Sequence, residues 1–251
     1  MRSENLQDTS TLSLRKVLVT GGTRGIGRAL TQALVLHGAE VLVCGRNRHA
    51  VEATQRELGV RGVACDITVE RDRRRLLSVV RGELAGLDVL IHNAGVQFDH
   101  DVCSGLDHER ANQEIALNLS APIALTDLML PLLVASGDGC LVNVTSALGV
   151  VPTPRAPVYS ATKAAFSAWS QAIRPRLASQ GVRVVEVIPP VVATEMTAGR
   201  HDGAISAEQA ATAIVGGLLA RRERILIGKA KLLLAMHRVA PGLARRFVQD
   251  R

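Results

Sequence analysis

The stretch KVLVTGGTRGIGRAL, residues 16–30, sets a short apolar run directly before a glycine-rich segment. The run at 16–20 is too short for a helix, and its β-branched residues are typical of a buried strand. Gly21, Gly25 and Gly27 follow, and the segment after them has helical spacing. The stretch therefore predicts a strand, a tight turn and a helix, which is how a βαβ unit begins.

The rest of the chain repeats this alternation. The runs with strand character are 16–20, 40–44, 62–66, 87–92, 140–145, 182–188 and 224–228. Strands that alternate with helices predict a parallel sheet with helices on both faces. We therefore expect an α/β fold in which one doubly wound Rossmann domain spans 15–228 around a seven-stranded parallel sheet. Residues 1–14 are expected to form a disordered arm, and 229–251 a basic amphipathic tail.

Composition agrees with this fold class. Of the 251 residues 47% are hydrophobic but only 2% aromatic, which favours a core of Leu, Val, Ala and Ile beneath helices. The four cysteines are widely spaced, without a CxxC pair or histidines at zinc spacing. With no signal peptide, this indicates reduced thiols in a cytoplasmic protein without a metal site. No apolar run of about 18 residues is present, so we expect no membrane span.

The net charge of +7 raises the question of a polyanionic partner. Arginines cluster at RDRRR (71–75) and RRER (221–224), and no aromatic residues separate them. Such clusters are more typical of solvated helix faces than of a nucleic-acid interface. We therefore expect no nucleic-acid partner.

The glycine-rich turn predicts a phosphate site. A turn without side chains lets backbone N–H groups and a helix N-terminus approach a pyrophosphate. In doubly wound sheets, ligands bind beyond the carboxyl ends of the strands. The expected dinucleotide-binding residues of the turn are Gly21, Thr23, Arg24, Gly25, Ile26 and Gly27. The alternative is a glycine-rich turn that binds no ligand.

The end of the second strand bears on the choice of nicotinamide cofactor. An acidic residue there would bind the ribose hydroxyls of NAD and repel a 2′-phosphate. This chain instead has Arg46 just past the strand, and Arg24 within the turn. A guanidinium binds phosphate with two parallel hydrogen bonds, so the pattern predicts NADP(H). In an arginine-rich chain, the alternative is that either residue is incidental.

Two later segments complete the expected cofactor site. Asp66, followed by Ile67, ends the third strand and is placed to bind the adenine amino group. The other interpretation of Asp66 is an N-cap of the next helix, and both roles are compatible. After the fourth strand comes Asn93-Ala94-Gly95, whose small residues let the backbone close over the cofactor.

Together these motifs resemble the short-chain dehydrogenase/reductase family in its form of about 250 residues. The matching segments, in family order over 16 to about 196, are TGGTRGIG, HNAG, the Asn of LNLSAP, the Ser of NVTSA and YSATK. The segment EIALNLSAPIAL and the Pro-Pro after the sixth strand are similar to the bacterial DltE-like branch.

The resemblance implies Tyr159 as the residue that exchanges a proton with the substrate oxygen. Tyr159 is the only tyrosine, and Lys163 is one of only four lysines among 30 basic residues. A free phenol has a pKa near ~10, and an ammonium group one helical turn away favours the phenolate. The family's lysine also binds the nicotinamide ribose, a task for a compact ammonium. The alternative is that a lysine stands at position 163 of this arginine-rich chain by chance.

Two further residues complete the implied catalytic set. Ser146, thirteen residues before Tyr159, would hold the substrate oxygen beside the phenol. Asn118 lies in a helical segment despite its poor helix propensity. The resemblance implies a local kink there and a water that relays protons to Lys163; the alternative is a surface asparagine.

The family's PGxVxT segment is altered after the sixth strand. Pro189, Val192 and Thr194 match, and the resemblance implies that they contact the nicotinamide carboxamide and the phosphates. Pro190 replaces the glycine, removes an N–H and stiffens the entry to the substrate loop. We expect 191–205 and 97–107 to line the substrate pocket, without defining a substrate.

The C-terminal tail departs from the family pattern, which commonly ends in a VDGG-like motif used in tetramers. Here basic residues surround apolar ones. We expect the tail to cap the pocket or pack on a partner subunit, and the alternative is that it lies on an anionic membrane. A homodimer through the helices that carry Asn118 and Tyr159 is implied, and the altered ending questions a tetramer.

These observations predict an NADP(H)-dependent oxidoreductase that moves hydride between nicotinamide and the carbon of a small-molecule carbonyl or secondary alcohol. The alternatives are a catalytically idle NADPH-binding sensor and a peripheral membrane protein, because a fold does not fix a function.

Overall fold

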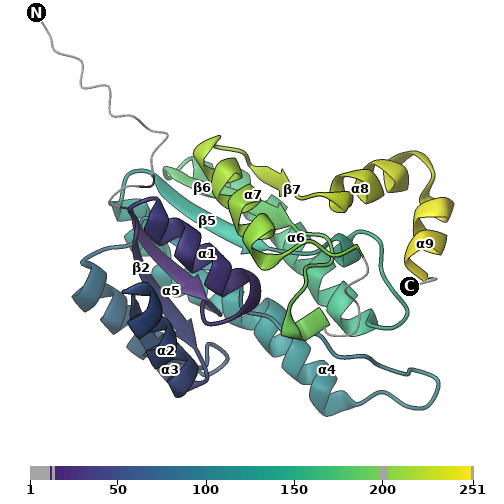
Figure 1. Ribbon diagram of the computed structural model, residues 1–251, viewed down its shortest axis with the longest axis horizontal. Helices are drawn as coiled ribbons and strands as arrows, with labels where there is room; N and C mark the ends of the chain where they lie inside the picture. Colours follow the sequence, from purple (N-terminus) through teal and green to yellow (C-terminus); the bar gives the residue numbers. More distant parts are fainter. Residues whose placement is uncertain (1–11, 13–14, 198–202, 250–251) are drawn as a thin grey trace, which may run out of the picture.

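The computed structural model describes residue 12, residues 15–197 and residues 203–249, and shows alternating strands and helices (Figure 1). The strands are β1 (Lys16–Thr20), β2 (Glu40–Gly45), β3 (Arg61–Ala64), β4 (Val89–His92), β5 (Gly139–Val144), β6 (Val182–Ile188) and β7 (Arg224–Leu226). The α-helices are α1 (Gly25–Leu36), α2 (Arg48–Leu58), α3 (Glu70–Val79), α4 (His108–Ile115), α5 (Ala121–Ala135), α6 (Pro157–Ala178), α7 (Ala207–Leu219), α8 (Lys229–Val239) and α9 (Pro241–Gln249). Shorter helical turns are η1 (Val80–Leu84), η2 (Ala116–Ser120), η3 (Ala147–Gly149) and η4 (Glu195–Thr197).

The seven strands form one parallel sheet in the order β3-β2-β1-β4-β5-β6-β7. The order reverses between β1 and β4, so ligands are expected beyond the carboxyl ends of these two strands. The predicted doubly wound, seven-stranded Rossmann domain is thus confirmed.

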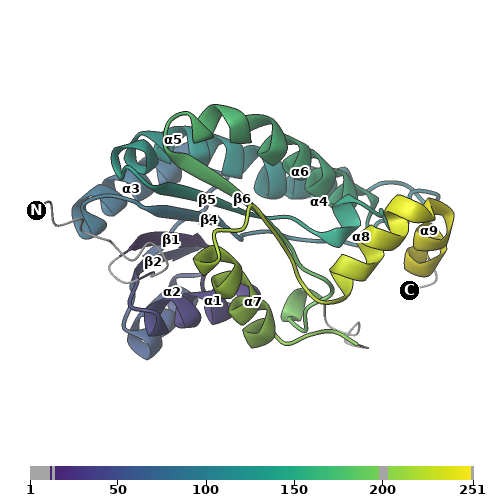
Figure 2. The same ribbon diagram turned by 90° about the horizontal axis from the view of Figure 1, so that it is seen from above.

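Helices cover both faces of the sheet (Figure 2). On one face, α1 and α7 pack over the apolar side chains of β1, β2 and β6, such as Val19, Val43 and Val187. On the other, α5 and α6 pack over the alternate side chains, such as Leu18 and Leu141. Both faces are buried, so the strands are continuous apolar runs.

Several predicted strand ends were wrong by one or two residues. The expected strands 62–66, 87–92 and 224–228 are Arg61–Ala64, Val89–His92 and Arg224–Leu226. Asp88 lies outside β4 because its carboxylate accepts the N–H of Lys16 at 2.7 Å, while Gly228, with φ 50°, turns the chain after β7. The patterns mark the buried centre of a strand better than its polar ends.

The continuous helix His108–Ala135, formed by α4, η2 and α5, is long and apolar enough to cross a membrane by length and composition. From the sequence we expected no segment of this kind. Leu125, Met129 and Leu133 on this helix are fully buried in the core against the sheet. Their burial accounts for the apolar residues on the face of the helix that packs against the sheet.

Two predicted segments include residues that the structure does not describe. The expected arm 1–14 lies outside the described residues except for Leu12, which is buried in the core. The expected substrate loop 191–205 is described at 191–197 and 203–205. The tail forms α8 and α9, which pack at one end of the domain (Figure 1).

Candidate active site

The glycine turn between β1 and α1 has little room for side chains. Gly21 and Gly25 have φ values of 66° and 51°, which favour glycine. A Cβ on Gly27 would collide with the carbonyl oxygen of Gly21 and with the side chain of Asn93. Arg24 occupies the N-cap position of α1 without a side-chain cap bond. The first N–H groups of α1 are thus available to an anion, and the turn fits a pyrophosphate.

The segment after β4 is tied to this turn. The Asn93 side chain donates to the carbonyl oxygens of Thr20 and Gly21, each at 3.1 Å. The backbone N–H groups of Asn93 and Ala94 both donate to the Thr20 hydroxyl at 3.1 Å. A Cβ on Gly95 would lie 3.2 Å from Oδ1 of Asn118. The predicted residues 93–95 therefore join the glycine turn to the helix that carries Asn118.

The ends of β2 and β3 hold the residues predicted for the adenosine end of the cofactor. Arg46 is exposed just past β2, and Thr23 of the turn packs beside Gly45. Asp66 accepts from the N–H and hydroxyl of Thr68 at 2.9 and 2.7 Å, and Ile67 is buried. The alternative of Asp66 as a helix N-cap was wrong, since α3 begins later, with Val69 at its N-cap.

Arg24, which we expected to bind the 2′-phosphate, forms an ion pair within the protein. Its guanidinium pairs with the Glu195 carboxylate at 3.0 Å, and both side chains are mostly exposed. The neighbouring Ile26 is half-buried against the core. Exposed ion pairs contribute about 0–1 kcal/mol, so this pair is weak enough to exchange for a phosphate.

The segment after β6 closes over the turn. Pro189 is buried, and Val192, also buried, forms a parallel bridge with Ile205. A Cβ on Gly25 would lie 3.1 Å from Cγ2 of Thr194. Thr194 and the glycine turn are thus neighbours in space, although they are far apart in sequence.

Asn118 is held inside the protein by an irregular turn of helix. It lies within the π-helical turn η2 and is only 1% exposed, so the surface alternative was wrong. Its Oδ1 accepts the N–H of Val96 at 2.9 Å, and its Nδ2 donates to the carbonyl oxygen of Val96 at 2.8 Å. Nδ2 also lies 3.3 Å from the Thr162 hydroxyl on α6. The expected distortion is present, and it aims Asn118 at the helix that carries Lys163.

Tyr159 and Lys163 lie near the start of α6, both buried. The Nζ of Lys163 lies 5.7 Å from the centre of the Tyr159 ring and donates to the carbonyl oxygen of Val144 at 2.8 Å. Burial lowers the pKa of Lys163 to about 8. A buried ammonium beside a phenol stabilises the phenolate form.

Ser146 follows β5 and is the N-cap residue of η3. Its Oγ accepts the N–H of Leu148 at 3.1 Å. At the other end of this turn, a Cβ on Gly149 would lie 2.8 Å from the carbonyl carbon of Lys163. The turn therefore packs directly on the backbone of α6, which brings the Ser146 segment beside the helix of Tyr159.

One buried polar pair was missed by sequence reasoning. Glu114 and His100 have fully buried side chains, and Nε2 of His100 lies 2.9 Å from Oε2 of Glu114. Oε1 of Glu114 accepts the N–H of Phe98 at 2.8 Å. The pair fastens the expected substrate segment 97–107 to α4. The available signal was spacing, because Glu114 stands four residues before Asn118 and thus on the same helix face.

The tail helices cover the segment that follows Ser146. Leu233 and Met236 of α8 and Ala244 and Val248 of α9 pack with Val151 and its neighbours. The tail helices thus pack on their own domain beside the Ser146 turn, and the three expected arrangements stay predictions.

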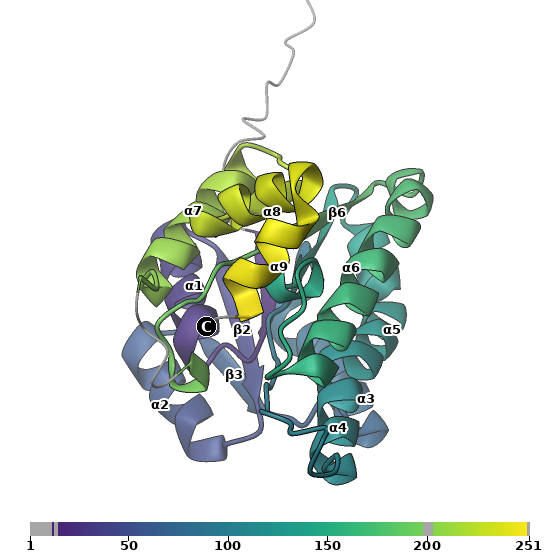
Figure 3. The same cartoon turned by 90° about the vertical axis from the view of Figure 1, so that its right-hand side faces the viewer.

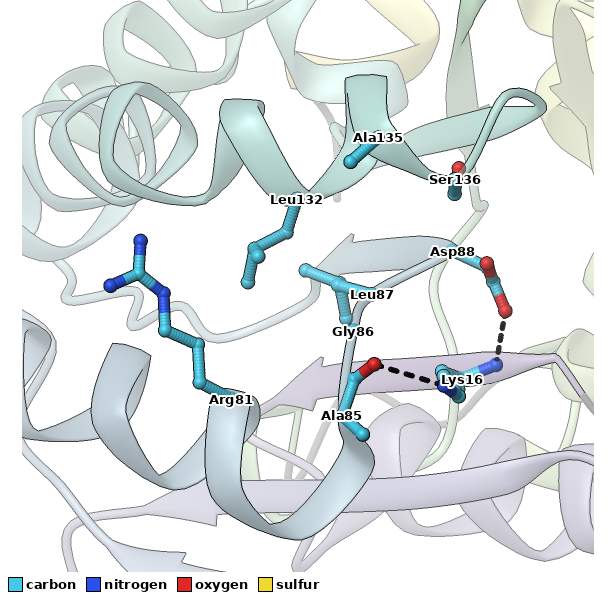
Figure 4. A pocket seen from close by; sticks show the side chains of 9 residues that line it. All are labelled: Lys16, Arg81, Ala85, Gly86, Leu87, Asp88, Leu132, Ala135 and Ser136. Atoms are coloured by element: carbon cyan, nitrogen blue, oxygen red, sulfur yellow. Dashed lines mark hydrogen bonds between the residues drawn. The ribbon is translucent and has the colours of Figure 1, made fainter.

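A cavity of about 470 Å³ lies at the opposite, amino end of the sheet (Figure 4). It is lined by Lys16, Arg81, Ala85, Gly86, Leu87, Asp88, Leu132, Ala135 and Ser136. The ammonium of Lys16 donates a hydrogen bond to the carbonyl oxygen of Ala85 at 3.1 Å, and the backbone N–H of Lys16 donates to the carboxylate of Asp88. The cavity contains none of the predicted catalytic residues. Among the described residues, no group of three or more His, Cys, Asp or Glu side chains could hold a metal ion.

Comparison with known proteins identifies relatives of this chain. A family model described as short chain dehydrogenase matches residues 15–204. An uncharacterised oxidoreductase, DltE of Bacillus subtilis, is 36% identical over 188 residues, which cover 74% of this chain and 75% of that protein. A protein named fatty acyl-CoA reductase, from Mycobacterium tuberculosis, is 32% identical over 252 residues, which cover 96% of this chain and 85% of that protein.

A solved structure is also similar. The crystal structure of a short chain dehydrogenase from Burkholderia cenocepacia, in complex with NADP, has a TM-score of 0.85 and 26% identity. The match covers 95% of this chain and 98% of that one. On this fold, these motifs and these relatives, the chain belongs to the short-chain dehydrogenase/reductase family of NAD(P)-binding oxidoreductases.

Proposed function

We propose that this oxidoreductase uses NADP(H) to interconvert a carbonyl compound and a secondary alcohol, with Tyr159 as the general acid and base. The observation that carries the proposal is the position of Lys163, buried and 5.7 Å from the centre of the Tyr159 ring. A structural lysine has little reason to be buried without a carboxylate partner, because burial of an ammonium costs free energy.

The proposed proton chemistry follows from these residues. The reduced nicotinamide, when bound, supplies a hydride to the carbonyl carbon. Tyr159 donates its hydroxyl proton to the carbonyl oxygen, which becomes the alcohol, and accepts a proton in the reverse direction. Ser146 donates a hydrogen bond to the same oxygen as negative charge develops on it. The charge of Lys163 stabilises the phenolate, and we propose that Asn118 holds a water through which Lys163 exchanges protons.

The NADP(H) preference is supported by three observations. Arg46 is exposed beyond β2, no acidic residue stands at the tip of that strand, and the similar Burkholderia enzyme was solved with NADP. We propose that Arg46 and Arg24 bind the 2′-phosphate, with Asp66 at the adenine. The pyrophosphate would lie against Gly21, Gly25 and the N-terminus of α1.

For the substrate, we propose a carbonyl compound with a long alkyl chain. The support is the relative named fatty acyl-CoA reductase, whose similarity extends over 96% of this chain. A homodimer through α4, α5 and α6 and a cytoplasmic location stay predictions.

The test begins with titration calorimetry of the purified protein against NADPH and NADH. Tighter binding of NADPH, followed by NADPH oxidation with ketones of increasing chain length, would support the proposal. Tighter binding of NADH would leave the oxidoreductase assignment standing and refute the 2′-phosphate site. Binding of neither cofactor would favour the catalytically idle alternative.

A further inference from the structure

Three large apolar side chains of the tail helices face solvent. Leu232 and Val239 of α8 are 71% and 86% exposed, and Leu243 of α9 is 60% exposed. We call these three residues, with the basic residues beside them, the tail face. Exposed side chains of this size are common singly, but three of them on two consecutive helices indicate an interaction surface.

The exposure follows from how α8 is packed. Leu232 and Val239 stand seven residues apart, two turns along one side of the helix, and the exposed Ala235 lies between them. The other side of α8 is held by Ala230, which packs with Ile188 in the core. The helix is therefore fixed to the domain by one face and presents a second apolar strip outward.

Positive charge surrounds this strip. The exposed basic residues of the two helices are Lys229, Lys231, Arg238, Arg245 and Arg246. The sequence of 229–249 contains no acidic residue. Lys231 and Arg238 repeat the seven-residue spacing of Leu232 and Val239, so the charged and apolar strips run side by side.

Apolar side chains flanked by basic ones fit the interface of an anionic bilayer. The apolar side chains insert among the acyl chains, and the anionic headgroups attract the basic side chains. A second copy of this chain fits less well, because a two-fold contact through the tail face would oppose two sets of like charges. The charge complementarity therefore points to lipid.

The tail face also lies at the functional end of the molecule. Figure 3 views the domain from this end, with α8 and α9 nearest the viewer. The same two helices pack on Val151 and Leu148, just after Ser146. A surface bound through the tail face would thus lie close to the proposed catalytic residues.

We propose that the tail face docks the protein on the surface of anionic membranes. The proposal is independent of turnover, and its test uses flotation of the full-length protein with vesicles. Vesicles of phosphatidylcholine alone are compared with vesicles that also contain phosphatidylglycerol. The wild-type protein is expected to float with the anionic vesicles, and less so as salt screens the charges.

The variant Leu232→Ser/Val239→Ser/Leu243→Ser should bind anionic vesicles at least about tenfold more weakly, because it removes the inserted apolar groups. Leu36→Ser is the matched control, since Leu36 is 78% exposed on α1, which ends at the amino end of the sheet. It should float like the wild type. Thermal unfolding and cofactor binding establish that both variants fold.

Failure of the wild-type protein to float with anionic vesicles would overturn the proposal. So would equal flotation of the triple variant and the wild type. If light scattering after size exclusion showed that the triple variant loses a dimer while vesicle binding stays the same, the tail face would belong to a second copy of the chain.

Discussion

The ammonium of Lys163 lies 5.7 Å from the centre of the Tyr159 ring, while its hydrogen bond goes to the carbonyl oxygen of Val144 at 2.8 Å. The lysine is therefore held by the end of β5, the strand that leads directly into Ser146. Strand β5 and helix α6 together fix the distance between the charge and the phenol. Four predictions test this arrangement and the proposed cofactor site.

Tyr159→Phe removes only the hydroxyl. We expect unchanged NADPH affinity in calorimetry and a fall in kcat of about 10²-fold to 10⁴-fold, because the proton donor is lost while the packing is kept. Steady-state NADPH oxidation measures the fall. A Phe variant with wild-type turnover would refute the assigned role.

The lowered pKa of Lys163 predicts that the free energy of unfolding depends on pH. Burial lowers its pKa from 10.5 to about 8, so below the lower value the native state carries a buried charge. Between the two values the unfolded chain binds more protons than the native protein, and the free energy of unfolding therefore rises with pH. The full gain is about 3 kcal/mol.

Lys163→Met serves as the comparison, because it removes this titration and keeps the apolar stem. We expect the variant to be more stable than the wild type near about pH 7, and the difference to shrink near about pH 9.5. Urea denaturation at both pH values measures it. A difference that does not change with pH would contradict a lowered pKa.

Arg46→Ala should weaken NADPH binding about tenfold or more and leave NADH binding unchanged, because it removes a charged partner of the 2′-phosphate. Arg24→Ala should act in the same direction and also break the ion pair with Glu195. Arg56→Ala, an exposed arginine in the last turn of α2, is the control. Equal loss of NADH affinity in the first two variants would count against a phosphate contact.

Gly27→Ala should lower the free energy of unfolding by about 1–3 kcal/mol and abolish cofactor binding, since the added methyl collides with Gly21 and Asn93. Gly216→Ala is the matched control, because no neighbouring atom lies within 4 Å of a Cβ there. That variant, in the last turn of α7, should be neutral or slightly more stable. Denaturation and calorimetry compare the two.

The sequence by itself determined the class of fold and the position of the glycine turn. Both depend on local features: apolar runs of strand length, helical spacing, and glycines where the backbone needs a positive φ or close contact. Chirality and short connections then leave few ways to arrange such elements. The strand ends were predicted less accurately, because they depend on contacts such as that between Asp88 and Lys16, which are 72 positions apart in the sequence.

The tertiary structure alone decided which distant side chains meet. The burial of Asn118 against Val96, the pairing of Arg24 with Glu195 and the contact of Glu114 with His100 each join separate segments. Sequence spacing could suggest that Glu114 and Asn118 share a helix face, but not what covers that face. Likewise, the sequence showed that the tail is amphipathic. Only the tertiary structure showed which of its apolar residues are buried, such as Ala230, and which face solvent, such as Val239. Periodicity is a property of neighbours along the chain, whereas burial depends on what the rest of the fold brings against them.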